Sequence, residues 1–440
     1  MRSPASKGHR ISATSVATSL TLIILIALAL RLGFFWDYQS QNPRQALSTI
    51  PFLFEPGNIA FSLAQGKGFA SPFHVDTGPT AWMTPVYPLI LAGIFRVFGA
   101  YTFHTFLAAV LMNILLSAAT CVPIFYSGKR IGGIGLAAAA AWLWAIFPNS
   151  ILLSFESLWD ACLSALLAAT ILWATLALDE SGRLREWCAY GVLWGLALMT
   201  NATLGSVLPF LLGWLIYRAW KEGRLKLERP AIASAIIVLS CVPWTIRNYV
   251  VFHKVIPLRS ILGLQLYVGN NPQAQYIWRG DFHPIHDAPE RARYIQLGEI
   301  AYMQEKKDQA IDFIVHHPAR EVQLAWHRFV ALWAGGTPTP IWDFVERDSL
   351  WFRGVLLFNI FASVCALLGM IRLYRAGSRY WLPAGVFPVV YPVAYYITLA
   401  LPRYRLPIDP IVLLLAVCAF APIKSGPEKF AGSRSIGAAR

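Results

Sequence analysis

The stretch Phe54-Glu55-Pro56-Gly57-Asn58 contains the first carboxylate that could carry out acid–base chemistry. Apolar residues precede Glu55, and Pro56 suits the first turn of a helix, so the pattern predicts a carboxylate held at a rigid helix start. Such a group could take the proton from an attacking hydroxyl group. A helix cap at the surface would show the same pattern, and this segment taken alone favours that interpretation.

Two more acidic residues, Glu156 and Asp160, lie four positions apart beside an apolar run. If 155–161 is helical, both carboxylates face the same side and could form one acidic vestibule with Glu55. A divalent metal could bind there, although the sequence has no HxxxH motif and no cluster of His and carboxylate residues. Charged residues at a membrane boundary can equally be solvated groups without a function. Further candidates in the polar segment around Glu55 are Asp76 and His74.

The basic residues that could bind a phosphate lie much later in the chain. Arg247 and Asn248 follow one apolar run, and Pro402-Arg403-Tyr404-Arg405-Leu406-Pro407 separates two others. Prolines bound this second stretch, so it cannot lie in the middle of a helix, and it presents two guanidinium groups and a phenol. Guanidinium groups suit phosphate, whereas anchoring at a membrane interface would not need paired arginines between prolines.

The composition indicates where these residues must be held. The chain has 440 residues, of which 56% are hydrophobic and 14% are charged, whereas soluble proteins carry about 25% charged residues. A soluble enzyme, a disordered chain and a collagen-like fibre are therefore excluded, and an all-α polytopic membrane protein is predicted. About ten apolar runs are candidate spans: 15–34, 103–127, 133–153, 158–178, 187–200, 203–218, 230–246, 350–371, 380–400 and 407–423.

The charge of the loops predicts the orientation of these spans. The short basic loops, which the positive-inside rule assigns to the cytoplasm, are 128–132, 179–186, 218–229 and 372–379. The net charge of +14 therefore reflects membrane orientation and not nucleic-acid binding. The predicted organisation is a cytoplasmic tail 1–14, a transmembrane catalytic module 15–246 with a periplasmic loop 35–102, a periplasmic segment 247–349, C-terminal spans 350–423 and a cytoplasmic tail 424–440. The first span is expected to be an uncleaved anchor.

This asymmetry limits the chemistry. The cytoplasmic loops are too short to fold a nucleotide-binding domain, and the sequence has no Walker A motif and no GxGxxG that follows a strand. An enzyme built from the outer segments needs an activated donor that arrives within the membrane, and a lipid-linked phosphate ester is the obvious class. A transporter or lipid flippase and a non-catalytic scaffold are the alternatives, although the spans hold almost no charge, unlike those of transporters.

Several stretches together carry a resemblance to a known family. They are Glu55 to Phe69, Gly78-Pro79-Thr80-Ala81-Trp82, Pro85-Val86-Tyr87-Pro88, Pro148 with Asp160, Pro243-Trp244-Thr245-Ile246-Arg247-Asn248, Gly269-Asn270-Asn271-Pro272 and Arg403-Tyr404-Arg405-Leu406-Pro407. In this order the chain resembles the GT-C superfamily of polytopic glycosyltransferases, which includes protein O-mannosyltransferases and the lipid A aminoarabinose transferase. The resemblance covers roughly residues 15–420.

The resemblance implies a GT-C bundle of about ten spans with a small periplasmic portion. It also implies that Glu55 is the catalytic carboxylate, that Asp160 is the acidic residue near the donor phosphate, and that Arg403 and Arg405 hold the lipid phosphate. The expected protein is an inverting glycosyltransferase of a bacterial inner membrane. It would use a polyprenyl-phosphate sugar, a glycan, lipid or protein acceptor, and no certain cofactor. Expected substrate-binding residues also include Arg247, Asn248, Tyr404 and Asn270.

Overall fold

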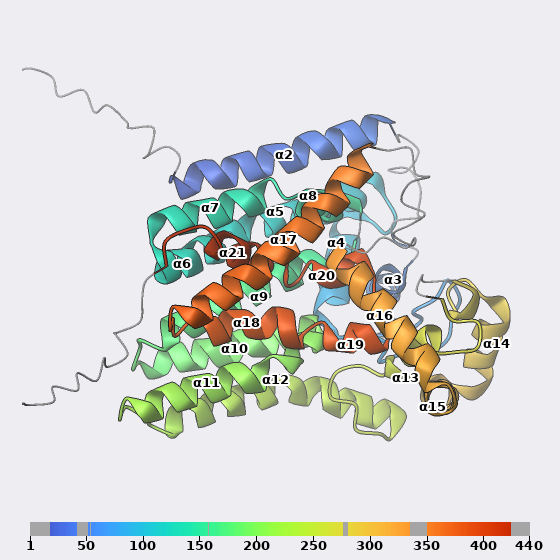
Figure 1. The fold of residues 1–440 in the computed structure, drawn as a ribbon. Helices are drawn as coiled ribbons and strands as arrows, with labels where there is room; N and C mark the ends of the chain where they lie inside the picture. The colour runs from blue at the N-terminus through green and yellow to red at the C-terminus, as the bar shows by residue number, and fades with distance from the viewer. Residues whose placement is uncertain are drawn as a thin grey trace, which may run out of the picture.

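The computed structural model describes residues 18–41, 52, 54–156, 158–275, 280–334 and 350–423. Within these residues the chain is helical, and the strand-type pairing found in them is one isolated antiparallel bridge between Ala70 and Pro79. Long helices run side by side to form an apolar body, and shorter helices gather at one end of it (Figure 1). The prediction of an all-α, multi-span membrane protein is therefore confirmed.

The apolar body is made of helices that follow the predicted apolar runs. They are α2 (Leu20–Gln41), α5 (Phe103–Ala119), α6 (Cys121–Gly132), α7 (Ile134–Ala145), α8 (Pro148–Glu156), α9 (Ala161–Leu178), α10 (Leu184–Thr200), α11 (Leu208–Lys221), α12 (Glu228–Phe252), α17 (Leu350–Arg375), α18 (Trp381–Val390) and α21 (Asp409–Cys418). The other helices are α3 (Glu55–Ala64), α4 (Val86–Phe98), α13 (Leu262–Gly269), α14 (Ala288–Leu297), α15 (Glu299–His316), α16 (Pro318–Ala334), α19 (Val393–Ile397) and α20 (Pro402–Arg405).

Fewer helices than predicted can each cross a membrane alone. Among the described residues, 6 helices are long and apolar enough to cross a membrane. The number rises to 7 if α7 and α8, which are bent by 44° at the break between them, form one span. Every other predicted run is helical but shorter, as in Trp381–Ile397 and Asp409–Cys418. A proline explains part of the difference, because Pro392 lies at the break between α18 and α19 within the run 380–400, and its missing backbone donor favours such a break.

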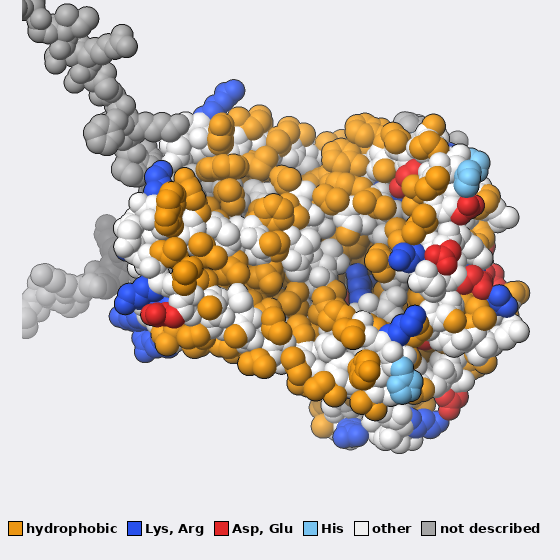
Figure 2. Space-filling view, turned by 90° about the horizontal axis from the view of Figure 1, so that it is seen from below, with side chains coloured by type: hydrophobic (Ala, Val, Ile, Leu, Met, Phe, Trp, Pro, Cys, Tyr) orange, Lys and Arg blue, Asp and Glu red, His pale blue; other side chains and the backbone are white. Residues whose placement is uncertain are grey.

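The predicted cytoplasmic loops meet at one end of the body. Asp179 accepts hydrogen bonds from Arg218 at 3.2 Å and forms an ion pair with Arg379 at 3.3 Å, and its neighbour Glu180 pairs with Arg130 at 2.5 Å. These contacts join the loops after α6, α9, α11 and α17. Since α9 spans 18 residues, Asp160 at its other end lies roughly 27 Å away. Charged side chains accordingly gather at two ends of an apolar surface (Figure 2).

A buried arginine of α2 fixes the break that leads to the other end. The side chain of Arg31 is fully buried and donates to the carbonyl of Ala145 at 3.1 Å, and to the hydroxyls of Ser117 at 2.9 Å and Ser150 at 2.8 Å. The carbonyls at the end of a helix lack hydrogen-bond donors within the helix, and the guanidinium of Arg31 provides donors where α7 ends. The bend to α8 that follows directs the chain toward Asp160.

Candidate active site

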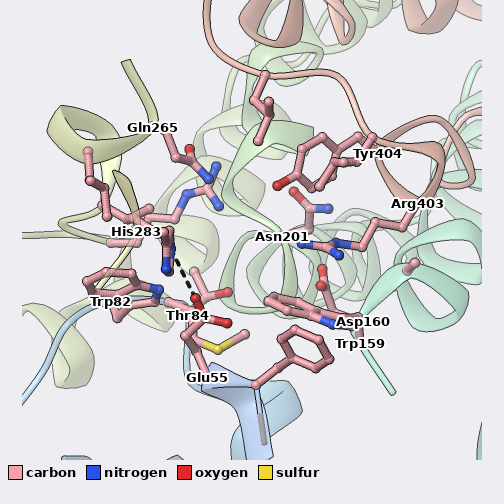
Figure 3. A pocket seen from close by; sticks show the side chains of 18 of the residues that line it. Glu55, Trp82, Thr84, Trp159, Asp160, Asn201, Gln265, His283, Arg403 and Tyr404 are labelled. Atoms are coloured by element: carbon pink, nitrogen blue, oxygen red, sulfur yellow. Dashed lines mark ion pairs between the residues drawn. The ribbon is translucent and has the colours of Figure 1, made fainter. Parts of the chain in front are cut away.

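A cavity of about 230 Å³ lies at the end of the bundle opposite the basic loops (Figure 3). Segments that are distant in the sequence meet there, from the first polar loop to the short helix α20. The polar and aromatic residues that line it are Phe54, Glu55, Trp82, Thr84, Trp159, Asp160, Thr200, Asn201, Arg259, Gln265, His283, His286, Tyr395, Arg403 and Tyr404. The cavity therefore combines four of the predicted site residues, Glu55, Asp160, Arg403 and Tyr404, with several that were not predicted.

Glu55 occupies one side of this cavity as the first residue of α3. Only 5% of it is exposed, and its Oε1 lies 3.3 Å from Nε2 of His283. Burial raises the pKa of Glu55 to about 7, against the opposing effects of the backbone N–H group, the charge of Arg403 and a hydrogen bond from Trp82. A carboxylate with a pKa near neutrality can accept a proton and release it again, which suits a general base.

The start of α3 is held by close backbone packing. A Cβ atom on Gly57 would lie 2.1 Å from the carbonyl oxygen of Phe52, so only glycine allows this approach. The side chain of Asn58 donates to the carbonyl of Pro72 at 3.1 Å and ties the helix to the polar loop behind it. Two residues of the motif Glu55-Pro56-Gly57-Asn58 therefore fix the position of the carboxylate.

Cationic groups lie near Asp160 on another side of the cavity. The guanidinium carbon of Arg403 lies 4.0 Å from the ring centroid of Trp159, and its buried Nε has no hydrogen-bond partner among the described residues. Arg259 donates to Thr203 at 3.2 Å. Burial raises the pKa of Asp160, whereas its hydrogen bond with Ser164 and the charges of both arginines act in the opposite direction.

Aromatic rings and an amide complete this side of the cavity. Tyr404 stacks on Tyr395 with ring centroids 4.7 Å apart and an interplanar angle of 16°. The amide of Asn201 donates at 3.3 Å to Ser164, which itself donates to Asp160 at 3.0 Å. The cavity thus offers a proton acceptor, two guanidinium groups and flat rings, a set that can bind an anionic sugar ester and activate a hydroxyl.

Arg405 was predicted to bind phosphate with Arg403, but the structure places it elsewhere. Its side chain is fully buried, donates to Asp409 at 2.6 Å and to the carbonyl of Trp333 at 2.5 Å, and does not line the cavity. The side chains at positions i and i+2 of a helical turn do not share a face. The residue type and position of Arg405 were consistent with phosphate binding, but its guanidinium forms an ion pair with Asp409 instead.

The three predicted binding residues of α12 and α13 also lie outside the cavity lining. Arg247 donates to the carbonyls of Thr80 and Phe69, each at 2.6 Å, and so holds the segment that leads to Trp82. Asn248 donates to the carbonyl of Ile256 at 2.9 Å, and Asn270 to that of Ile397 at 2.8 Å. These side chains position the walls of the cavity and do not face into it.

The remaining candidates do not line the cavity either. Asp76 accepts hydrogen bonds from Ser71 and Gly78 in an exposed turn, and His74 is exposed nearby. The predicted shared face of Glu156 and Asp160 is wrong, because α8 ends at Glu156 and α9 begins only at Ala161. Glu156 is exposed, so the acidic vestibule is not formed.

The described residues contain no group of three or more His, Cys, Asp or Glu side chains that could hold a metal ion. Asp160 is close to the guanidinium groups of Arg259 and Arg403, whose charges oppose a cation at that position. The residues present therefore do not fit a divalent metal, and we derive no step through one.

Sequence reasoning missed several residues of the cavity. His283, Arg259 and Asn201 line the cavity but are not among the predicted site residues. Arg259 lies in a connecting segment without periodicity, so no local signal distinguishes it from a surface arginine. Trp82 ends a motif that carried the family resemblance, and this was the one available signal.

Comparisons with known proteins agree with this architecture. Residues 82–246 match the family model described as dolichyl-phosphate-mannose-protein mannosyltransferase. No curated protein sequence matches the chain at significant similarity. The apo oligosaccharyltransferase of Archaeoglobus fulgidus is similar in structure, with a TM-score of 0.52, 13% identity, and coverage of 94% of this chain and 51% of that one.

Two further solved structures show related similarity. The Archaeoglobus fulgidus oligosaccharyltransferase AglB in complex with an inhibitory peptide and a dolichol-phosphate has a TM-score of 0.51 at 12% identity, over 91% of this chain and 49% of that chain. The chain thus spans about half the length of these enzymes. ArnT of Cupriavidus metallidurans bound to undecaprenyl phosphate has a TM-score of 0.40 at 15% identity, over 93% and 78%, which is too loose to carry an argument.

The bundle of apolar helices, with the cavity at one end, shares its fold with the archaeal oligosaccharyltransferase. The match to the dolichyl-phosphate-mannose-protein mannosyltransferase model covers residues 82–246, which is less than half of the chain. The resemblance carried by the sequence motifs is therefore confirmed.

Proposed function

We propose that this protein is an inverting glycosyltransferase that moves a sugar from a polyprenyl-phosphate donor to an acceptor hydroxyl group. The observation that carries the proposal is the convergence of Glu55 from the first polar loop with Arg403 from near the C-terminus in one cavity. Arg259 joins Arg403 as the second cation, in the role that was predicted for Arg405. A base and two cationic groups are thus present at the end of an apolar bundle, where a lipid headgroup would lie.

The chemistry follows from these groups. Glu55 accepts the proton of the acceptor hydroxyl as its oxygen attacks the anomeric carbon of the sugar. The bond from that carbon to the phosphate oxygen breaks, and its electron pair leaves with the polyprenyl phosphate. Arg403 and Arg259 stabilise the phosphate that carries this charge. A single displacement inverts the configuration at the anomeric carbon, and no acid is needed for a leaving group that departs as a stable anion.

The donor class is supported by relatives and by the geometry. The matching family is described by its use of dolichyl-phosphate-mannose, and AglB was solved with a dolichol-phosphate bound. Figure 2 shows a basic side chain in a recess between the apolar body and the charged end of the molecule. An anionic headgroup whose chain lies in the bilayer could reach cations at such a junction.

The proposed orientation places this cavity on the outer face of a bacterial inner membrane. The loops joined through Asp179 and Glu180 are rich in arginine, which favours a cytoplasmic position for that end of the bundle. Both termini would then be cytoplasmic. The donor would then be lipid-linked, because nucleotide donors are not expected outside the cytoplasm, and the acceptor would be a glycan, lipid or protein with a free hydroxyl group.

A transporter is less consistent with the arrangement of the cavities. A small cavity at the basic end is lined by residues such as Asp179, Arg224 and Arg229, and it shares no lining residue with the cavity of Glu55. Alternating access requires a substrate site near the middle of the membrane that connects to both sides. The position of Glu55 and Arg403 at one end of the helices instead favours transfer at one membrane face.

The experiment is a transfer assay on the purified protein with a panel of labelled polyprenyl-phosphate sugars. Loss of the sugar from the lipid should depend on Glu55, and Glu55→Gln should lower the rate by about 10²- to 10⁴-fold. Asp76→Asn is the matched control, because Asp76 is a carboxylate of the same loop that lies outside the cavity. A Glu55→Gln variant with unchanged turnover would remove this residue from its role.

A further inference from the structure

The cavity contains a histidine that comes from a different part of the chain than the proposed base. We infer that His283 is a positioning residue: a neutral imidazole whose Nε2–H donates to Glu55 and keeps the carboxylate oriented and charged for proton abstraction. This inference rests on the proposed function and assigns a role to a residue outside the segment that matches the family model.

The hydrogen bonds of His283 determine which ring nitrogen carries the proton. The backbone N–H of Ile285 donates to Nδ1 of His283 at 3.3 Å. A ring nitrogen that accepts a hydrogen bond carries no proton, so the proton of the neutral ring lies on Nε2. That nitrogen faces Oε1 of Glu55 at 3.3 Å, as the dashed line in Figure 3 marks. The imidazole is therefore a donor to the carboxylate and not a competing base.

The backbone around His283 holds this orientation. The N–H of His283 donates to Gly280 at 3.0 Å, and its carbonyl accepts from His286 and Asp287, each at 2.9 Å. Arg291 of α14 donates to the carbonyl of Pro284 at 3.0 Å and so fixes the same turn. A donor on a rigid turn loses little entropy when it binds its partner, which is a condition for preorganised catalysis.

The surroundings keep the ring neutral. The rings of Trp82 and Phe73 approach His283 edge-on, with centroids 5.5 and 6.5 Å away. Burial lowers the pKa of His283 to about 3, and the nearby charges of His286 and Arg403 act in the same direction. The charged and titratable groups that face this pair are thus Glu55 on α3, His286 on the same turn and Arg403 on α20. His286 and Arg403 disfavour a second positive charge at position 283, as burial does, whereas the carboxylate of Glu55 is the one group of the three that would favour it.

The test compares His283→Leu with His283→Gln in the pH dependence of kcat/KM. Loss of a hydrogen bond to the charged form should raise the pKa of Glu55 by about one pH unit. At a pH below the pKa of Glu55, kcat/KM of His283→Leu should therefore be about tenfold lower than that of the wild type. At high pH the two values should become equal. His283→Gln retains an N–H donor and should restore the limb. His74→Gln, a histidine outside the cavity, is the control.

A second readout does not depend on the donor sugar. Infrared titration of the carboxyl band that is absent from Glu55→Gln gives the ionisation of Glu55 directly, and it should move upward in His283→Leu but not in His283→Gln. An unmoved band or limb in both variants would overturn the role of His283 even if wild-type transfer is observed. A shifted band in a protein that transfers no sugar would support the pairing and reject the proposed function instead.

Discussion

Arg403 and Arg405 lie two residues apart in α20, yet one faces the cavity and the other is buried against Asp409. The guanidinium of Arg403 stacks on Trp159 and has a buried nitrogen without a partner among the described residues, so it is available to a ligand. Arg405 donates hydrogen bonds to Asp409 and to the carbonyl of Trp333 at the end of α16. One arginine therefore serves binding, and the other anchors the short helix that carries it.

Replacing Arg403 should weaken transfer without weakening the fold. In Arg403→Gln the donor phosphate loses hydrogen bonds from a charged group, each worth about 1.5–3 kcal/mol, so kcat/KM should fall by roughly 10- to 100-fold. The melting temperature in lipid nanodiscs should stay close to that of the wild type, because no direct ion pair joins Arg403 to a carboxylate of the described residues, unlike Arg405 with Asp409. Unchanged kcat/KM would exclude Arg403 from donor binding.

Replacing Arg405 should have the opposite profile. Arg405→Gln leaves Asp409 buried and unpaired, which typically costs about 3–5 kcal/mol. Thermal unfolding in nanodiscs should show this loss, with activity lowered only in proportion to the folded protein. Removing both charges in Arg405→Met with Asp409→Leu should recover most of the stability, since no lone charge then remains in the interior. A stable single variant would show that the ion pair does not anchor α20.

The raised pKa of Glu55 also predicts a stability effect. The pKa of an exposed glutamate is about 4.3, whereas burial raises the pKa of Glu55 in the folded protein to about 7. The folded state therefore binds this proton more tightly than the unfolded state does. Its stabilising contribution is therefore present at low pH and is lost as the pH rises through 7, by an amount on the order of 3 kcal/mol. The difference in melting temperature between Glu55→Gln and wild type should shift in favour of the variant from pH 5 to pH 8. A constant difference would contradict the raised pKa.

The sequence allowed the helices and the base to be predicted because both depend on local pattern. Apolar runs become helices wherever they occur, and Glu55 followed by Pro56 begins α3 as expected. The number of spans was harder to predict, because breaks such as the one between α7 and α8 depend on Arg31. This arginine of α2 donates hydrogen bonds to the carbonyls that are left free at the end of α7. Local apolarity does not reveal such a partner.

The cationic side of the cavity could be predicted only in part. Arg403 and Arg405 have the same residue type in the same motif, and the difference between them comes from Asp409 one turn later in the structure. Arg259 precedes the apolar helix α13 and His283 follows it, so neither residue lies in an apolar run that would place it in the cavity. Residues with a role that depends on tertiary contacts therefore stayed outside the prediction.

The close contact at Gly57 predicts a position where one methyl group matters. In Gly57→Ala the new Cβ would lie 2.1 Å from the carbonyl oxygen of Phe52, so α3 must move and Glu55 with it. The variant should lose about 1–3 kcal/mol of stability and a larger share of its activity. Gly93→Ala in α4 is the matched control, because nothing lies within 4 Å of its new Cβ. Equal melting temperatures and rates for the two variants would contradict the packing described here.

The buried carboxylate of Glu299 should support the site from outside the cavity. It accepts hydrogen bonds from the N–H of Ala81 at 2.8 Å and from the hydroxyls of Ser260 at 2.6 Å and Tyr294 at 2.7 Å. Ala81 precedes Trp82 and Ser260 follows Arg259, so one carboxylate joins the segments that carry an aromatic wall and a cation of the cavity. Glu299→Leu leaves these donors buried without an acceptor, at about 1–3 kcal/mol for each.

The predicted outcome for Glu299→Leu is a lower melting temperature together with a kcat/KM that falls further than the folded fraction does. Glu305→Leu on the same helix is the control, because its ion pair with Arg293 is partly exposed, and such pairs contribute at most about 1 kcal/mol. Both readouts should separate the two variants. If Glu299→Leu melted and turned over like Glu305→Leu, the link from α15 to Trp82 and Arg259 would not position the site.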